Sequence, residues 1–306
     1  MKLKHSHAVW LMVLAPLLWS TAGVVTRQLE HARAFEITFW RSFFTAASLL
    51  VILPLWQGRG VWARMWQERH ALLLSGVCWG VMFTAFMVAL TLTSVANVLI
   101  TMAAGPLLTA LTARLVIGHQ LPARTWGAIV VAGLGIAYMF GSQLGEGGVL
   151  GTLVAFCVPV AAAINWTLVQ RSQRSGHQID LVPAVLVGAV LSAVVTLPLA
   201  WPLSASVHDV VLLAGLGFGQ LAVPCALAVV CARVLSAPEV SLLALLEVLF
   251  GIVLAWLGAD EVPSQQVLLG GALVTGALLA NEWLGWRERA GHYHIETLEV
   301  DAGDKR

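Results

Sequence analysis

Residues 71–113 read ALLLSGVCWGVMFTAFMVALTLTSVANVLITMAAGPLLTALTA, and this stretch decides the fold class. Its 43 residues include no Asp, Glu, Lys or Arg. A bilayer core about 30 Å thick is crossed by roughly 20 apolar helical residues, so the stretch is about twice as long as one transmembrane helix. The short polar run at 91–94 divides it. We therefore predict two consecutive membrane-spanning helices, 71–90 and 95–114.

The same pattern extends along the whole chain. Of its 306 residues 59% are apolar and 11% are charged, and the charges lie in narrow bands between apolar stretches. A helix satisfies its own backbone hydrogen bonds in lipid, so each stretch is predicted to be a transmembrane helix. We predict an all-α polytopic membrane protein with ten transmembrane helices, at residues 8–26, 37–56, 71–90, 95–114, 125–142, 149–170, 181–201, 209–231, 237–257 and 264–283.

The basic residues predict the orientation in the membrane. With ten spans both termini lie on one side, and alternate loops form two sets. One set contains fourteen Lys and Arg residues, the other contains only Arg27 and Arg33, and Arg41 lies within a span. The positive-inside rule places both termini in the cytoplasm. The first apolar stretch is too long for a signal-peptide core, so we predict a retained helix after a short segment, 1–7.

Motifs for other kinds of chemistry are missing from the sequence. There is no H-E-x-x-H motif and no Gly-rich phosphate loop, so direct coupling to ATP within this chain is not expected, nor are cofactors or metals. The cysteines at 78, 157, 225 and 231 lack metal-ligand spacing and are predicted to be small buried apolar side chains. The polar tail, 285–306, is predicted to be cytoplasmic and partly disordered.

The chain contains an internal repeat. Residues 94–138 align with residues 235–279 at an offset of 141, and both copies read as a helix, a polar turn closed by proline, and a glycine-rich helix. The aligned pairs include Ala96 with Ala237, Pro106 with Glu247, Pro122 with Pro263 and Gly135 with Gly276. Each copy would hold five helices, and because five is odd the second copy enters the membrane from the opposite face. Inverted repeats of this kind are typical of secondary transporters, with the substrate site at the midplane between the halves.

Five motifs in the two copies resemble a known family. They are PLLWSTAGVVTR (16–27), FWRSFF (39–44), ALTLTSVANVLITMAAGPLLTAL (89–111), AAAINWTLVQRS (161–172) and ARVLSAPEVSLLALLEVLFGIVLAWLGADEVPS (232–264). In their order they resemble the EamA-type branch of the drug/metabolite transporter superfamily, over residues 8–142 and 149–284. The chain departs from the family pattern at His119-Gln120, where a glycine-glutamate turn is usual, and at Val248, where proline often follows the acid.

The resemblance implies ten helices with both termini cytoplasmic, a central cavity and alternating access. It also implies transport of amino acids, other metabolites or drugs, often outward. The two departures concern turns and helix geometry, so they leave the implied fold intact. They also mean that the substrate of a relative cannot be transferred to this chain.

Two charged residues within the spans are candidates for the site. Glu247 lies at the centre of the ninth predicted span, where a carboxylate is costly and is expected to face the protein interior or a water-filled cavity. It either gains and loses a proton during transport or braces the two halves. Arg41 either binds a substrate carboxylate or has a structural role, reaching the headgroups or pairing with Glu36, and the structural role is favoured.

Uncharged candidates lie in the same spans. Trp19, Trp79 and Trp166 are away from the predicted helix ends, where they would form an aromatic wall for an amphipathic substrate or pack between helices. Asn97 and Gln220 would line the path or form hydrogen bonds between helices. The glycines at 127, 133, 135, 215, 217 and 219 predict close helix packing, and the prolines at 106, 159 and 224 predict kinks.

Together these features predict a secondary transporter in a bacterial inner membrane. It would move a small metabolite, an amino acid or an amphipathic compound, as an exporter, with protons as the candidate driving ion. The expected partners are the lipid bilayer and the small-molecule substrate, a homodimer is left open, and nucleic acid is not expected. The alternative is an integral-membrane enzyme acting on lipid or prenyl substrates, which would need clustered His, Asp or Glu at one interface.

Overall fold

The computed structural model of the chain describes residues 3–26, 28–93, 95–118, 120–141, 149–174, 179–259 and 264–303. Helix makes up 86% of the chain, and these residues contain no strand, so the predicted all-α fold is confirmed. The elements are α1 (His5–Thr26), α2 (Ala34–Gln57), α3 (Val61–Gln67), α4 (Arg69–Leu92), α5 (Val95–Met102), α6 (Gly105–Ile117), α7 (Ala123–Phe140), α8 (Val149–Arg174), α9 (Pro183–Ala200), α10 (Val207–Gly215), the π-helix η2 (Leu216–Ala222), α11 (Val223–Cys231), α12 (Ala237–Ala244), α13 (Leu246–Ala259) and α14 (Gln265–Gly303).

Eight helical segments of the described chain are long and apolar enough to cross a membrane, by length and composition. They are α1, α2, α4, α8, α9, the segment α10–η2–α11, the segment Ala237–Leu254 and the first part of α14. Two shorter apolar helices, Gly105–Ile117 and Ala123–Met139, fall on the remaining predicted spans. The chain is therefore a multi-pass membrane protein, because these segments are helical, long enough to cross a bilayer and predominantly apolar.

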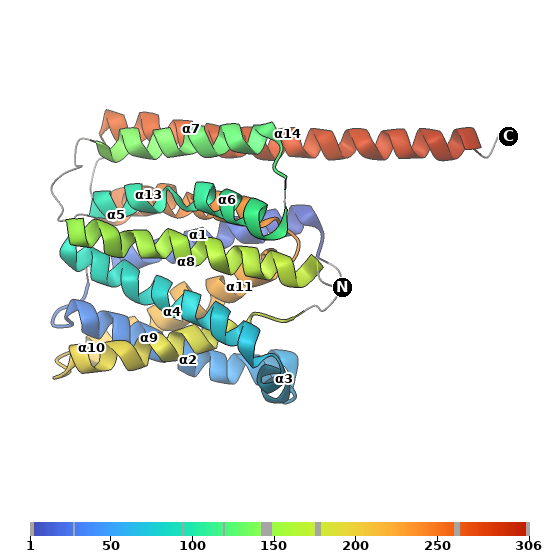
Figure 1. Cartoon of the computed structure of the whole chain (residues 1–306). Helices are drawn as coiled ribbons and strands as arrows, with labels where there is room; N and C mark the ends of the chain where they lie inside the picture. Colours follow the sequence, from blue (N-terminus) through green and yellow to red (C-terminus); the bar gives the residue numbers. More distant parts are fainter. Residues whose placement is uncertain are drawn as a thin grey trace.

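Two helical segments lie outside the predicted spans. The first is α3, a short helix between α2 and α4 whose Trp66 is exposed and has the Arg69 guanidinium 5.6 Å from its ring centroid. The second is the end of α14, which continues as helix to Gly303 and extends beyond the bundle (Figure 1). The helix thus includes residues 285–303 of the predicted tail.

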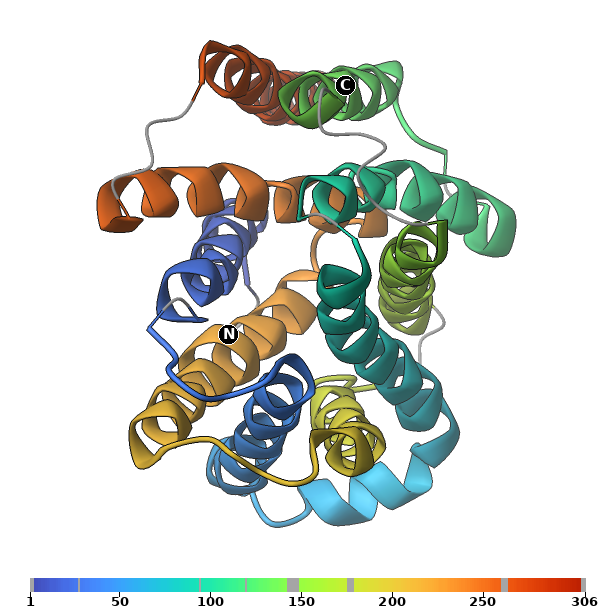
Figure 2. The same ribbon diagram turned by 90° about the vertical axis from the view of Figure 1, so that its left-hand side faces the viewer.

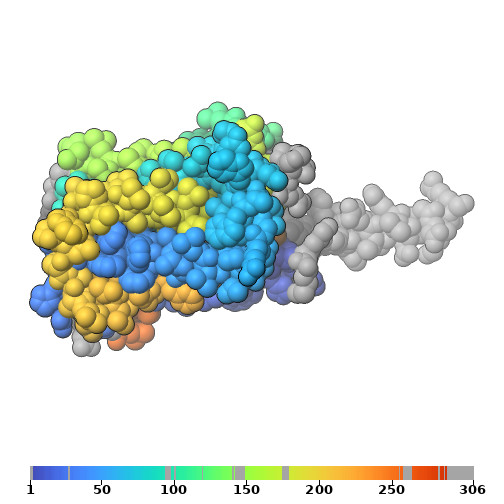
Figure 3. Space-filling model, turned by 90° about the horizontal axis from the view of Figure 1, so that it is seen from below, coloured from blue at the N-terminus to red at the C-terminus, as the bar shows by residue number. Residues whose placement is uncertain are grey.

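The helices form a bundle with two distinct edges. α7 packs against α14 at one edge, and α2 packs against α9 at the other (Figures 1 and 2). Viewed from the second edge, the chain segments of α2 and α9 run side by side (Figure 3). Between the edges α1 packs on α11 and α13, while α8 packs on α4 and α6.

Two predicted spans are interrupted in their middle. One breaks between α5 and α6 and the other between α12 and α13. At each break a backbone N–H bonds to the carbonyl three residues earlier, Ala104 N to Thr101 O at 3.2 Å and Leu245 N to Leu242 O at 3.1 Å. Pro106, predicted to mark a kink, follows the first break directly. The sequence pattern predicted continuous helices because apolar side chains continue through both breaks.

Glycine allows close helix contact at some of the predicted positions only. A Cβ on Gly217 would lie 2.8 Å from Arg41 O, and a Cβ on Gly135 would lie 2.9 Å from Gly270 O, so these glycines allow η2 to approach α2 and α7 to approach α14. The prediction of close packing is wrong for the glycines at 127, 133, 215 and 219, where a Cβ would meet nothing within 4 Å. Helical spacing alone does not reveal which face of a span meets another helix.

The largest apolar cluster fills the end of the bundle near the N-terminus. It includes Met12 of α1, Val169 of α8, Val229 of α11 and Val240 of α12, all almost fully buried. Three of the four cysteines, at 78, 225 and 231, are buried as predicted. The prediction is wrong for Cys157, which is exposed on α8.

Candidate functional site

One cavity of about 150 Å³ collects most of the residues singled out in the sequence. It lies at mid-depth between α1, α2, α4, α8, η2 and the junction of α12 with α13. Six of the seven candidates line it, namely Trp19, Arg41, Trp79, Trp166, Gln220 and Glu247. The seventh, Asn97, has a side chain that lies outside the described part of the structure. Residues far apart in the sequence thus meet at one place.

A hydrogen-bond relay joins three of the helices that form this cavity. Arg41 of α2 donates from Nη2 to Gln220 Oε1 at 2.7 Å, and Gln220 donates from Nε2 to Trp19 O of α1 at 3.1 Å. Arg41 and Gln220 are only 6% and 5% exposed. A second guanidinium nitrogen, Nη1, lies 3.1 Å from Met87 Sδ. Burial and these partners hold the Arg41 guanidinium at the wall of the cavity.

The π-helix η2 presents Gln220 to Arg41. Single π-helical turns within α-helices occur frequently at functional sites, because the wider turn reorients side chains. Gly217 brings η2 close to α2, and Thr45 Oγ1 fixes the contact by donating to Gly217 O at 2.9 Å. Pro224, which has no N–H to donate, follows directly in the first turn of α11.

Arg41 makes neither of the two structural contacts considered from the sequence, an ion pair with Glu36 or a reach to the headgroups, and bonds to Gln220 instead. Glu36 accepts hydrogen bonds from Ser204 N at 2.8 Å and Ala205 N at 2.7 Å instead of pairing with Arg41. Arg41 is buried in the bundle and does not extend to the helix end. The guanidinium Nε has no hydrogen-bond partner among the described residues, so a donor remains beside the cavity.

Glu247 lies immediately after the break between α12 and α13. It occupies the first turn of α13, where the aligned peptide dipoles favour a negative charge. Glu247 makes no hydrogen bond with any described residue, but it is close enough to Arg41 for an electrostatic interaction. A carboxylate and a guanidinium thus face the same cavity without a direct contact between them.

Aromatic and thioether side chains form the rest of the wall. Trp79 and Trp166 meet edge to face with centroids 5.6 Å apart, and Phe83 lies 5.5 Å from Trp79. Trp79 Nε1 is buried, and within the described part of the chain it has no hydrogen-bond partner. Phe86 and Met102 also line the cavity and were not predicted, because an apolar residue in a span carries no signal of its own.

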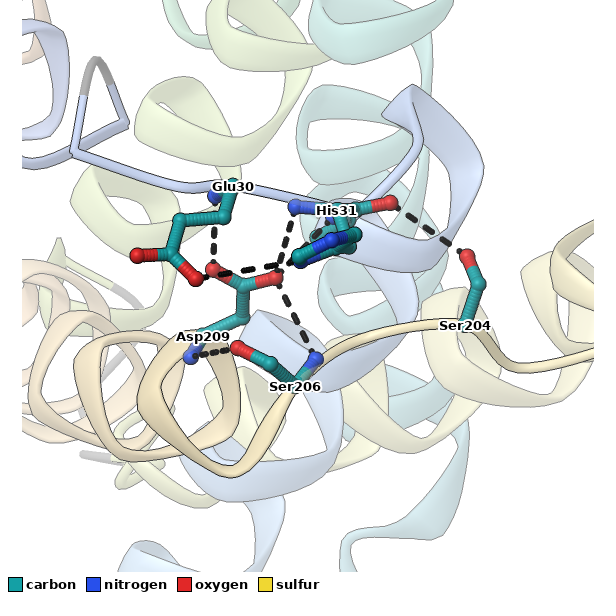
Figure 4. Close-up of polar contacts among 6 residues, drawn as sticks. Glu30, His31, Ser204, Ser206 and Asp209 are labelled. Carbon is teal, nitrogen blue, oxygen red and sulfur yellow. Dashed lines mark hydrogen bonds and ion pairs between the residues drawn. The ribbon is translucent and has the colours of Figure 1, made fainter.

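A clasp at the end of the bundle opposite the N-terminus fixes the helices that carry Arg41 and Gln220. Asp209, at the start of α10, accepts from the backbone N–H groups of Glu30, His31 and Ala32 at 2.8, 3.0 and 3.1 Å (Figure 4). Glu36, at the start of α2, holds the segment before α10 through its bonds to Ser204. Each carboxylate therefore binds the loop that leads into the other helix.

The described residues contain no group of three or more His, Cys, Asp or Glu that could hold a metal ion. The fold and the cavity define a multi-pass helical membrane protein with a polar site at mid-depth. Residues 6–141 match the model of the EamA-like transporter family, part of the drug/metabolite transporter superfamily. The resemblance predicted from the sequence is thereby confirmed for the first repeat, and for residues 149–284 it stays a prediction.

No curated protein matches the sequence. Among solved structures, 29 chains match. One protein of known crystal structure superposes with a TM-score of 0.72, covering 92% of this chain and 98% of its own, at 18% sequence identity. At this identity the likeness shows a shared fold.

Proposed function

We propose that the protein is a secondary transporter that exports a small metabolite, an amino acid or an amphipathic compound by alternating access. The observation that carries the proposal is the mid-depth cavity, in which Arg41 and Glu247 from opposite halves of the chain face one another. In the proposed setting, a bacterial inner membrane, both termini are cytoplasmic because the basic loops lie at that end. A homodimer is compatible with the exposed α7–α14 edge.

Ten transmembrane helices in two inverted repeats are part of this proposal. The break at Ala104 and the break at Leu245 are 141 residues apart, which equals the offset of the sequence repeat. The packing is reciprocal as well: α1 packs on α11 and α13, and its counterpart α8 packs on α4 and α6. Discontinuous helices near the midplane are typical of transporter binding sites. The positions of the two breaks and the reciprocal packing of α1 and α8 thus support the same two-fold symmetry.

The groups around the cavity favour a particular kind of substrate. The guanidinium Nε of Arg41 and Nε1 of Trp79 are unpaired donors, which would bind an acceptor such as a carboxylate. The aromatic wall would bind an apolar or aromatic body, and Glu247 would bind a cationic group or a proton. We therefore favour a small amphipathic solute with an acceptor at one end.

The proposed cycle uses Glu247 for coupling. Deprotonated Glu247 would bind a cationic group of the substrate, and protonation would remove the charge that holds it, so a proton and that cationic group would compete for Glu247. In this proposal, the apolar cluster at the end near the N-terminus would close the cavity on the cytoplasmic side. A cycle of export would open this cluster to load substrate from the cytoplasm.

The test is efflux from cells that contain wild type or Glu247→Gln at matched membrane levels. A panel of amino acids, metabolites and toxic amphipathic cations is followed with and without a proton uncoupler. We expect wild type to export at least one compound, and both the substitution and the uncoupler to stop it. Glu30→Gln, which removes a carboxylate 59% exposed in a loop, is the matched control and is expected to leave efflux unchanged.

The outcomes separate the parts of the proposal. Efflux that persists with the uncoupler and in Glu247→Gln would mean a facilitator without proton coupling. If no compound moves and cell lipids or prenyl products change on expression, the membrane-enzyme alternative replaces the transporter.

A further inference from the structure

A second cavity of about 410 Å³ lies at the end of the bundle near the N-terminus, and it shares no lining residue with the central cavity. Its walls come from four parts of the chain: the start of α1, the segment that leads into α7, the end of α8, and the turn between α11 and α12. We call it the basal cleft. The helix α12 runs from the basal cleft, at Glu239, to the central cavity, at Ala244.

Basic side chains from three of these parts face the basal cleft. They are His5 of α1, Arg124 of α7 and Arg233 of the turn before α12. Arg124 is anchored by donation from Nη1 to Asn281 O at 2.8 Å, and Arg233 is anchored by an ion pair with Asp180. A guanidinium has five N–H donors, so an arginine anchored in this way can still donate to a ligand.

The one carboxylate in the lining is engaged within the protein. Glu239 accepts from Ser236 N at 2.8 Å and from Ser236 Oγ at 3.0 Å, in the capping box that begins α12, and lies 3.7 Å from His5 Nε2. The side chain of Gln170, also in the lining, accepts from Ala237 N at 3.1 Å. Among the described residues, the two carboxylates at the basal cleft, Glu239 in its lining and Asp180 beside Arg233, are therefore both engaged within the protein.

We propose that the basal cleft binds a phosphate group, held between Arg124 and Arg233. Arginine matches the oxygens of phosphate with paired N–H donors, and basic pockets between transmembrane helices at the cytoplasmic side bind anionic lipid headgroups. Apolar lining residues such as Leu121 and Leu235 would contact the ester part of the ligand. The source is the headgroup of an anionic phospholipid or a soluble phosphate ester.

The test measures binding and needs no transport. The full-length protein in a maltoside detergent is titrated with short-chain phosphatidylglycerol, with phosphatidylcholine of the same chain length, and with glycerol phosphate, and the midpoint of thermal unfolding is followed by tryptophan fluorescence. Gln173→Glu adds a negative charge to the lining and removes no bond of either arginine, whereas Gln173→Ala is its neutral control. Arg59→Gln removes a basic residue from another loop at the same end.

We expect phosphatidylglycerol to bind, phosphatidylcholine not to bind, and Gln173→Glu to weaken binding roughly fivefold, the effect of about one charge at such a site. Gln173→Ala and Arg59→Gln should bind like wild type. Substitution of both Arg124 and Arg233 by Gln should abolish binding. Substitution of both by Lys, which keeps the two charges, should retain it. Equal affinity for glycerol phosphate would assign the site to a soluble ester. Equal binding of the two lipids, or no difference between Gln173→Glu and Gln173→Ala, would overturn the proposal.

Discussion

Gly217→Ala is the substitution with the sharpest structural consequence. The new Cβ would lie 2.6 Å from Phe44 Cβ, 2.8 Å from Arg41 O and 2.9 Å from Thr45 N. The obstructing atoms are backbone atoms and a Cβ, so no side-chain rotation relieves the contact. An ordinary contact is about 3.4 Å or longer, so η2 and α2 would separate by roughly 0.8 Å in a densely packed interior.

The expected cost follows from two opposing effects. Overpacking in a core costs about 1–3 kcal/mol, and alanine recovers about 0.5–1 kcal/mol of helix propensity over glycine. We expect a net destabilisation of about 1–2 kcal/mol, or a midpoint of thermal unfolding lower by about 2–5 °C. Separation of η2 from α2 also stretches the bond between Arg41 and Gln220, so efflux should fall with stability.

The assay compares Gly217→Ala with Gly219→Ala in the same detergent. Gly219 is on the same π-helix, and a Cβ there would meet nothing within 4 Å, so this control should unfold at or slightly above the wild-type midpoint. Equal midpoints for the two variants would refute the argument that η2 is held against α2 by the missing side chain of Gly217.

Three further predictions concern other contacts. Asp209→Asn should lower the free energy of unfolding by about 1 kcal/mol, because an amide cannot accept all the loop N–H bonds that the carboxylate accepts. Glu30→Gln, a change of an exposed side chain, should leave the free energy of unfolding unchanged. Gly135→Ala should destabilise the packing of α7 on α14, because the new Cβ would lie 2.9 Å from a backbone oxygen, whereas Gly133→Ala should be neutral. Equal midpoints of thermal unfolding for these two variants would contradict the prediction. Gln220→Leu should destabilise the protein by about 3 kcal/mol, because it leaves the buried Arg41 guanidinium without its acceptor. Gln220→Glu, which keeps an acceptor, should restore most of this stability. Equal stability of the two variants would contradict the hydrogen-bond relay.

The positions of the helices could be predicted from the sequence because lipid imposes a strong constraint. An apolar stretch of about 20 residues has few alternatives to a helix in a bilayer, and the structure has helix in each of the ten predicted ranges, with two of them interrupted at Ala104 and Leu245. The breaks at Ala104 and Leu245 could not be predicted, because side chains on both sides are equally apolar. Proline gave a partial signal: Pro106 follows a break and Pro224 follows η2, but α8 continues unbroken through Pro159.

The candidate site could be predicted in composition but not in geometry. Glu247 and Arg41 stand out because charge is rare within a span, and the structure brings both to one cavity. The bond from Arg41 to Gln220 depends on the register of a π-helix, which has no sequence pattern of its own. The exposure of Cys157 could not be predicted from the sequence either, because lipid-facing and buried positions favour the same small apolar residues.

The clasp at the far end of the bundle recognises main-chain atoms. Asp209 accepts from the backbone N–H groups of residues 30–32, which are present whatever side chains those residues carry. Glu36 accepts from the backbone N–H groups of residues 204 and 205 and, in addition, from Ser204 Oγ at 2.8 Å. The loop therefore keeps its shape when its side chains change, except to proline, which has no N–H. Positions 30 and 31 thus provide a rigid attachment point for a spectroscopic label, from which distances to a second label on α7 or α14 would report movement of the bundle edges.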